Sequence, residues 1–72
     1  MTLHERLVYL KTSRNILQKD IANAIGLSLR AYQYYERGDC EPTASNLIAL
    51  ADYFNVSIDY LVGRTDNPEI NR

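Results

Sequence analysis

The side chains that commonly carry catalysis are few in this sequence and are not paired with one another. The chain has one histidine, His4, and one cysteine, Cys40, which falls in an expected loop without a histidine near it in sequence. We therefore expect neither a metal-binding histidine nor a catalytic thiol. Glu36 lies near Asp39 and Glu41, but these carboxylates have no partner for acid–base chemistry. The sequence thus predicts no enzyme, no metal site and no cofactor.

Charge is unevenly distributed along the 72 residues, whose net charge is −1. Residues 1–38 carry six basic and three acidic side chains, a balance of +3, whereas residues 39–72 carry two basic and six acidic ones, a balance of −4. The N-terminal half could therefore face phosphate groups, the alternative being a chance asymmetry of a solvated surface. With 46% hydrophobic and 24% charged residues, the chain has the composition of a globular domain.

Cysteine usage and hydropathy predict a cytoplasmic protein. A single cysteine cannot form an intramolecular disulfide, which fits an intracellular setting. No apolar run approaches the roughly 18 residues needed to cross a bilayer, and the first ten residues carry charges where a signal peptide would be apolar. No membrane partner and no small-molecule ligand are expected.

Apolar residues recur at helical spacing and predict an all-α fold. A capping-box pair, Thr2 and Glu5, precedes the first apolar stripe, and Ser28, Thr43 and Ser57 are suitable N-caps further along. No alternating strand pattern is present. We expect one domain over residues 1–63 and a polar tail or linker over 64–72. The five expected helices cover residues 3–14, 18–25, 29–37, 44–54 and 58–62.

The stretch Gln18–Gly38 predicts two short helices joined by a tight turn. Gly26 can take the left-handed backbone conformation that ends a helix sharply, and Ala22 is small enough for two helices to cross closely. Such a helix-turn-helix leaves the outer face of its second helix free to contact a partner. The residues expected to hold the two helices together are Ile21, Ala22, Ile25, Gly26, Leu27, Tyr32 and Tyr35.

An ordered set of motifs over about residues 3–63 resembles the phage-repressor family of helix-turn-helix domains, of the Cro/cI or Xre type. The motifs are Gln18-x-x-Ile21-Ala22-x-x-Ile25-Gly26-Leu27-Ser28, then Tyr35-Glu36-Arg37-Gly38, Pro42, and Asn55-Val56-Ser57 with Leu61. The resemblance implies a five-helix bundle of the lambda-repressor-like type. It also implies a transcriptional regulator, repressor-like, that binds operator DNA, usually as a homodimer.

Carried over to this chain, the resemblance implies two sets of DNA contacts from the helix-turn-helix and its surroundings. Arg30 has the chemistry to bind guanine O6 and N7, Gln33 to pair with adenine, and Leu29 to pack on a thymine methyl. The expected base-contacting residues are Ser28, Leu29, Arg30, Gln33 and Tyr34. The expected phosphate-contacting residues are Gln18, Lys19, Arg14 and Arg37.

Two positions depart from the family pattern. Leu17 stands where a serine or threonine is common, so the second helix lacks a hydroxyl cap. Lys11 stands where an arginine often pairs with the glutamate that matches Glu36, and a lysine cannot form the two-pronged contact of an arginine. A Lys11–Glu36 pair is therefore a hypothesis for the structure to test.

The leading hypothesis is sequence-specific binding of double-stranded DNA, with a homodimer reading a pseudo-palindromic operator. A short last helix cannot bury all of its apolar side chains, which makes it the expected dimer surface. The alternative is a protein-interaction module of the same fold, such as an antitoxin or adaptor, favoured by the modest charge and by Leu29 and Tyr34 on the protruding face. The residues expected at the dimer interface are Val56, Ile58, Tyr60 and Val62.

Overall fold

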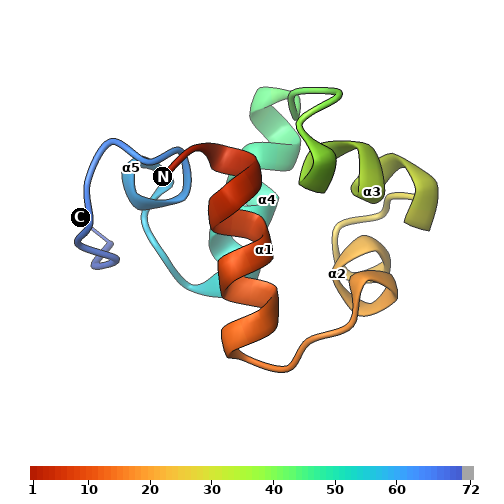
Figure 1. Cartoon of the computed structure of the whole chain (residues 1–72), viewed down its shortest axis with the longest axis horizontal. Helices are drawn as coiled ribbons and strands as arrows, with labels where there is room; N and C mark the ends of the chain where they lie inside the picture. Colours follow the sequence, from red (N-terminus) through yellow and green to blue (C-terminus); the bar gives the residue numbers. More distant parts are fainter. Residues whose placement is uncertain (71–72) are drawn as a thin grey trace.

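Five helices and short connections make up the computed structural model, which describes residues 1–70 (Figure 1). No strand occurs within this range, so the predicted all-α fold is confirmed, and each helix lies within one or two residues of its expected bounds. No helix in the same range has the length and apolar character that crossing a membrane requires. The helices are α1 (Leu3–Ser13), α2 (Gln18–Ala24), α3 (Leu29–Arg37), α4 (Ala44–Phe54) and α5 (Ile58–Leu61).

Local capping explains where four of the helices begin. Thr2 and Glu5 form the predicted capping box at the start of α1, in which each side chain bonds the other residue's backbone N–H. The N-caps of α3, α4 and α5 each accept a hydrogen bond from a backbone N–H three residues later; they are Ser28, Thr43 and Ser57. Leu17 gives α2 no side-chain cap, as the sequence predicted.

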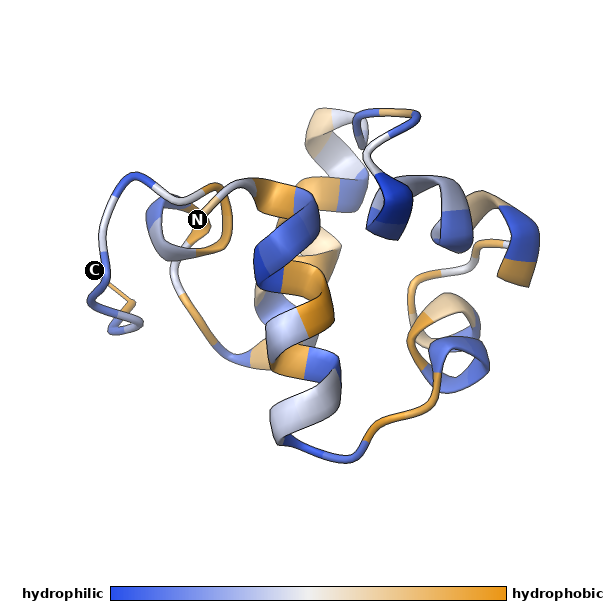
Figure 2. Ribbon diagram, viewed as in Figure 1, coloured by the Kyte–Doolittle hydropathy of each residue, from blue (hydrophilic) through white to orange (hydrophobic). Residues whose placement is uncertain are grey.

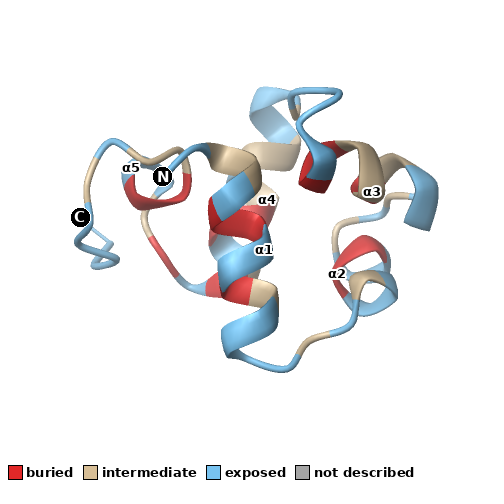
Figure 3. Ribbon diagram, in the orientation of Figure 1, coloured by how far each residue is buried: buried red, intermediate tan, exposed pale blue. Residues whose placement is uncertain are grey.

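The core lies where the inward faces of all five helices meet (Figure 3). Tyr32, Phe54 and Leu7 are among its largest fully buried side chains. Hydrophilic residues predominate on α3, whereas α4 is largely apolar (Figure 2). This contrast indicates that α4 is a central core helix and that α3 is exposed along one side. The buried apolar residues are Leu7, Leu10, Ile21, Ala22, Tyr32, Tyr35, Leu50, Ala51, Phe54, Val56, Tyr60 and Leu61.

Two of the four residues predicted at a dimer surface are buried within the chain itself. Val56 and Tyr60 are only 3% and 8% exposed, so their own side chains offer little surface to a second chain. Tyr60 is covered from α1, because the Arg6 guanidinium stacks 3.9 Å from the centroid of its ring. Ile58, at 40% exposure, and the partly exposed Val62 remain on the surface of this segment.

Residues 64–70, expected as a polar tail, turn back onto the helical unit. The backbone N–H of Ser57 donates to the carbonyl of Pro68 at 3.0 Å, which ties the segment to the start of α5. Asp66 lies 3.5 Å from a terminal nitrogen of Arg6 on α1. The segment through residue 70 is therefore attached to the domain by polar contacts as well as by the chain.

Candidate nucleic-acid interface

The turn between α2 and α3 has the geometry that the sequence predicted. Gly26 adopts a left-handed conformation with φ at +74°, and the Leu27 N–H donates to the Ala22 carbonyl at 2.8 Å, which closes α2. Figure 1 shows α2 almost end-on while α3 runs across the view, so the two axes cross steeply. This arrangement is a helix-turn-helix, with α3 at the edge of the molecule.

A polar network ties the inner side of α3 to α1 and α2. The Lys11 Nζ and the Gln18 Nε2 both donate to Glu36 Oε1, at 2.9 and 3.0 Å. The Gln33 Nε2 in turn donates to Gln18 Oε1 at 3.1 Å. The hypothesis of a Lys11–Glu36 pair is confirmed, and because the Glu36 side chain is only 6% exposed, the pair is shielded from water.

Tyr32 lies on the buried side of α3, four residues before Glu36. Burial, and secondly the Glu36 carboxylate, raise the pKa of the Tyr32 phenol well above its usual value of about 10. Within residues 1–70, neither the Tyr32 hydroxyl nor the second Glu36 oxygen meets hydrogen-bond geometry with a partner. The inner side of α3 thus places a buried phenol next to the Lys11–Glu36 ion pair.

The outer side of α3 carries a stripe of three residues, Arg30, Tyr34 and Arg37, which we call the arginine–tyrosine stripe. The Arg30 Nε donates to the Tyr34 hydroxyl at 2.9 Å, and the Arg37 guanidinium lies 5.0 Å from the centroid of the Tyr34 ring. Positions separated by four and three residues share one helix face. At the start of the same helix, Ser28 is exposed and Leu29 is 44% exposed.

The predicted base-contacting residues therefore differ in how accessible their side chains are in the free chain. Arg30, Leu29 and Ser28 face solvent at the N-terminal end of α3. Tyr34 is half-buried between two arginines, and the amide of Gln33 is engaged with α2. A base contact by Gln33 would require this amide to share or release its bond to Gln18.

Three of the predicted phosphate-contacting residues lie at the start of α2 or at the end of α3. Gln18 and Lys19 begin α2, where Lys19 is exposed and forms no ion pair within residues 1–70. Arg37 is the last residue of α3 and pairs with Asp39, with 3.1 Å between Nε and Oδ2. Asp39 was not anticipated as a partner, although its position two residues after Arg37 would have allowed it.

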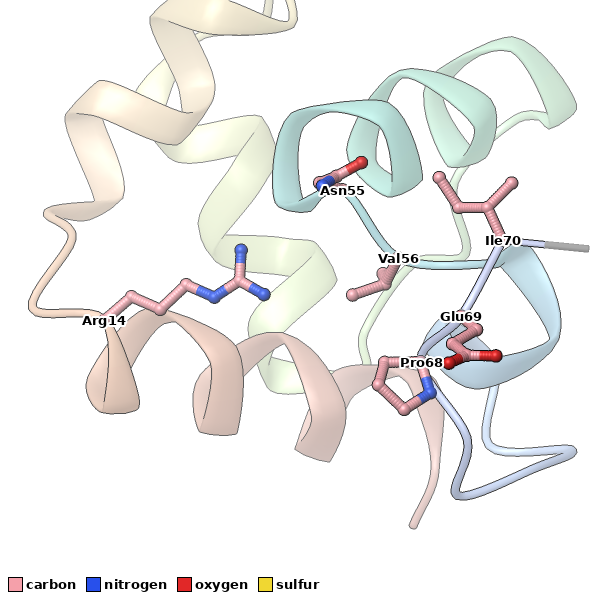
Figure 4. Close-up of a pocket in the computed structure, with 6 residues that line it drawn as sticks. All are labelled: Arg14, Asn55, Val56, Pro68, Glu69 and Ile70. Carbon is pink, nitrogen blue, oxygen red and sulfur yellow. The ribbon is translucent and has the colours of Figure 1, made fainter.

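Arg14 is directed away from the other predicted phosphate contacts. Its guanidinium donates to the Phe54 carbonyl at the end of α4 and lies 5.8 Å from the Phe54 ring. Figure 4 shows Arg14 extending toward the connection between α4 and α5, at a hollow of about 440 Å³. The hollow is lined by Arg14, Asn55, Val56, Pro68, Glu69 and Ile70.

The sequence interpretation missed the structural role of Arg6. This side chain is 5% exposed, and its Nε donates to the Tyr60 carbonyl at 3.1 Å, which joins α1 to α5. A signal was present, because Arg6 is three residues after Leu3 and four before Leu10 and so lies on the apolar face of α1. Arg6 therefore does not contribute to a DNA-facing charge.

Folding also brings His4 and Cys40 together, although they are far apart in sequence. Both line a hollow of about 320 Å³ that also includes Glu41. The His4 ring is within 3.2 Å of the Thr2 hydroxyl. Among residues 1–70, no three side chains of metal-ligating type are grouped closely enough to hold an ion.

A protein-family model described as helix-turn-helix matches residues 9–61, which include α2, the turn and α3. The match covers well over half of the chain. The chain belongs to the helix-turn-helix family. Its resemblance to the Cro/cI or Xre type is supported by relatives that are phage repressors.

Among the relatives of this helix-turn-helix domain are named regulators of transcription. It is 42% identical over 64 residues to the cryptic phage CTXphi transcriptional repressor RstR of Vibrio cholerae, a match covering 89% of this chain and 57% of the relative. It is 32% identical over 65 residues to the uncharacterized HTH-type transcriptional regulator YobD of Bacillus subtilis, covering 90% of this chain and 58% of the relative. The chain thus spans a little over half the length of these relatives, none of which is named as an enzyme.

Solved structures share the fold of this helix-turn-helix domain. The P22 c2 repressor in complex with a synthetic operator has a TM-score of 0.83 and 29% identity, with coverage of 90% of this chain and 98% of that one. A transcriptional regulator from Listeria innocua has a TM-score of 0.82 and 37% identity, with coverage of 86% and 58%. The predicted repressor-type five-helix fold is therefore confirmed.

Proposed function

We propose that this chain is the sequence-specific, double-stranded DNA-binding domain of a repressor-like transcriptional regulator, with α3 inserted into the major groove. The observation that carries the proposal is the exposed N-terminal end of α3, where Ser28, Leu29 and Arg30 project from a helix-turn-helix. The related P22 c2 repressor is described in complex with operator DNA, which supports the same activity here.

Base recognition is assigned to the outer side of α3. The Arg30 guanidinium has the donors to bind guanine, and the exposed Leu29 has the apolar surface to pack on a thymine methyl. Ser28 offers a hydroxyl that already accepts the Ala31 N–H and retains its own proton for donation. Gln33 and Tyr34 complete the proposed set, closer to the middle of the helix.

Phosphate contacts are assigned to residues flanking α3. Lys19 is exposed and uncompensated in the described range, whereas Gln18 is oriented by its bonds to Glu36 and Gln33. Arg37 ends α3 and is suited to a phosphate beyond the bases. Arg14 would contribute only after its guanidinium leaves the Phe54 carbonyl, so it is the weakest member of the set.

We propose that the domain binds DNA as a homodimer on a pseudo-palindromic operator. One domain offers few base contacts, and two domains would read half-sites about one helical turn apart. The exposed Ile58 and the partly exposed Val62 form the proposed contact, with Val56 and Tyr60 supporting them from the core.

Selection of bound sequences from a random duplex pool tests this proposal directly. We expect an enriched sequence with two related half-sites about 10 base pairs apart. Anisotropy titrations of that duplex and of a scrambled duplex, each at two salt concentrations, then separate specific from electrostatic binding. Absence of binding to any duplex at low salt would remove the proposed function.

The division of roles between base and phosphate contacts is tested by two alanine substitutions. Arg30→Ala should weaken binding to the selected duplex by about 1–3 kcal/mol and relax the preference at one base pair. Arg37→Ala should weaken all duplexes about equally and reduce the salt dependence. If both substitutions had the same effect on base preference, the assigned roles would be wrong.

The second candidate is a protein-interaction module of the same fold. It is favoured by the 44% exposure of Leu29 at the protruding end of α3 and by the pairing of Arg37 with Asp39, which lowers the positive charge there. The titrations at low salt distinguish the two functions, since a protein-interaction module would bind no duplex.

A further inference from the structure

Tyr34 is the common contact of two arginines that have different proposed roles. Its hydroxyl accepts the Arg30 Nε–H at 2.9 Å, and the Arg37 guanidinium lies 5.0 Å from its ring centroid. The Arg30 guanidinium carbon is 5.8 Å from the same centroid, so the 2.9 Å hydrogen bond to the hydroxyl is the closer of its two contacts with Tyr34. One phenol therefore contacts both cations through different parts of its structure.

The contact with the hydroxyl restricts how Arg30 can present its donors. A guanidinium carries five N–H donors, and the bond to Tyr34 uses the one on Nε. Within residues 1–70 the two terminal nitrogens of Arg30 have no ion pair or hydrogen bond. They remain available as a pair, and a pair of parallel donors matches the O6 and N7 acceptors of guanine.

Arg37 is held differently and does not compete for the hydroxyl. Its Nε is paired with Asp39 at 3.1 Å, and its guanidinium contacts the aromatic ring. A cation near the ring limits movement of the phenol, and so limits movement of the hydroxyl that holds Arg30. Within the arginine–tyrosine stripe, Tyr34 therefore restrains the Arg30 side chain, and Arg30 presents the donors suited to a base.

We propose that Tyr34 is a positioning residue, whose hydroxyl fixes Arg30 so that its two terminal nitrogens face a guanine in the major groove. Base selectivity at one base pair then depends on a hydroxyl that does not itself touch that base. This inference rests on the proposed function and replaces a direct base contact by Tyr34 with an indirect one. The physical gain is preorganisation, because a flexible arginine side chain is ordered before binding.

A double-mutant cycle tests the proposal, with the full chain and the duplex obtained by selection. The variants are Tyr34→Phe, Arg30→Ala and the combination of both. Binding is measured to the selected duplex and to duplexes that replace the guanine at the Arg30-dependent base pair. Tyr9→Phe is the matched control, because Tyr9 is 48% exposed on α1 and its hydroxyl has no hydrogen bond within the described residues.

We expect Tyr34→Phe to reduce the preference for guanine at that base pair about two- to tenfold, the range for loss of one hydrogen bond. The slope of affinity against salt should not change, because no charge is removed. In the Arg30→Ala background, Tyr34→Phe should have no further effect on preference. In the free protein, nuclear magnetic resonance should show faster solvent exchange of the Arg30 Nε–H in Tyr34→Phe, and no change in Tyr9→Phe.

Three outcomes would overturn the inference while leaving DNA binding intact. An unchanged guanine preference in Tyr34→Phe would show that the hydroxyl does not position Arg30. An equal loss in the Arg30→Ala background would show that Tyr34 contacts DNA directly. An unchanged exchange rate of the Arg30 Nε–H would show that the free protein does not form the hydrogen bond between Arg30 and Tyr34. Failure of the wild-type chain to bind any duplex would instead remove the proposed function on which the inference rests.

Discussion

At the scale of a single residue, Asp39 offsets part of the positive charge at the end of α3. It pairs with Arg37, and both side chains are more than half exposed, at 56% and 61%. Exposed pairs of this kind contribute little to stability, about 0–1 kcal/mol, so their main effect here concerns the approach to DNA. Because Asp39 offsets its charge, we expect Arg37 to attract phosphates less strongly than an unpaired arginine would.

Asp39→Asn should therefore increase affinity for all duplexes, about two- to fivefold at low salt, with base preference unchanged. The gain should diminish as salt is raised, because screening weakens exposed charges. Titrations at two salt concentrations measure this effect. Asp52→Asn on α4 is the charge-matched control. An equal gain in both variants would mean that net charge, rather than the Arg37–Asp39 pair, is responsible.

Tyr32 should make folding sensitive to alkaline pH. Burial and then Glu36 raise the pKa of this phenol in the folded chain above its ordinary value of 10.0. The folded state thus retains a proton that the unfolded state releases, so the stabilising contribution is complete below about pH 10 and decreases as pH rises above it. Its maximum slope is about 1.4 kcal/mol per pH unit.

Tyr32→Phe should flatten this dependence between pH 9 and 11, as measured by urea unfolding at each pH. At neutral pH the substitution should change the free energy of unfolding by less than about 1 kcal/mol, because the hydroxyl has no hydrogen-bond partner in the described structure. An alkaline slope identical to that of the wild type would contradict the assignment to Tyr32.

At the scale of an element, the turn between α2 and α3 requires a particular backbone conformation at Gly26. Gly26 has φ at +74°, yet a side-chain carbon placed there would meet no atom within 4 Å. The requirement for glycine is therefore conformational and does not come from crowding. Gly63 differs, because an added carbon would lie 1.8 Å from the Met1 carbonyl oxygen.

Gly26→Val should destabilise the domain by about 1–2 kcal/mol or more, since a β-branched residue disfavours the left-handed conformation. Gly26→Asn should cost clearly less, because asparagine tolerates that conformation. Urea unfolding compares the two variants. Equal losses would show that space at the turn, rather than backbone conformation, is limiting.

The uncapped start of α2 offers a way to stabilise the same motif. Leu17 has the extended backbone of an N-cap, with φ at −85° and ψ at 147°, but makes no capping bond and is 57% exposed. Leu17→Ser should raise the free energy of unfolding by about 0.5–2 kcal/mol by satisfying an N–H at the start of α2. Thermal unfolding of Leu17→Ser and of Leu17→Ala, which lacks the hydroxyl, measures this gain. No difference between serine and alanine would contradict it.

At the scale of the whole molecule, contacts within the chain engage most of the basic side chains of residues 1–38. Of the six basic side chains in residues 1–38, one is buried and three are engaged by a carboxylate or a carbonyl. With few free cations, we expect few phosphate contacts per chain and a modest salt slope. The four engaged residues are Arg6, Lys11, Arg14 and Arg37, and the two without such a partner in the described range are Lys19 and Arg30.

The proposed homodimer makes a prediction for Ile58. Ile58→Asp should shift the chain to the monomer in analytical ultracentrifugation and weaken binding to a two-half-site operator about tenfold or more, because it places charge in an apolar contact. Affinity for a single half-site should not change. Ile48→Asp is the matched control, since Ile48 on α4 has a similar exposure, 49% against 40%. Unchanged self-association in Ile58→Asp would remove α5 from the proposed interface.

The sequence by itself determined the helices, their caps and the helix-turn-helix. These features depend on residues within about four positions of one another, as in the capping box of Thr2 and Glu5 or the left-handed Gly26. For the same reason the missing cap at Leu17 could be predicted. The resemblance to repressors added the candidate DNA-facing residues, whose types are visible without a structure.

Only the tertiary structure decided how those residues are engaged. Burial of Arg6 against Tyr60, the bond from Arg14 to Phe54, and the return of residues 64–70 join positions far apart in the chain. Such contacts depend on which helix faces pack together, and local spacing does not specify that packing. The Lys11–Glu36 pair could be suspected, but its extension through Gln18 to Gln33 required three helices to meet at one carboxylate.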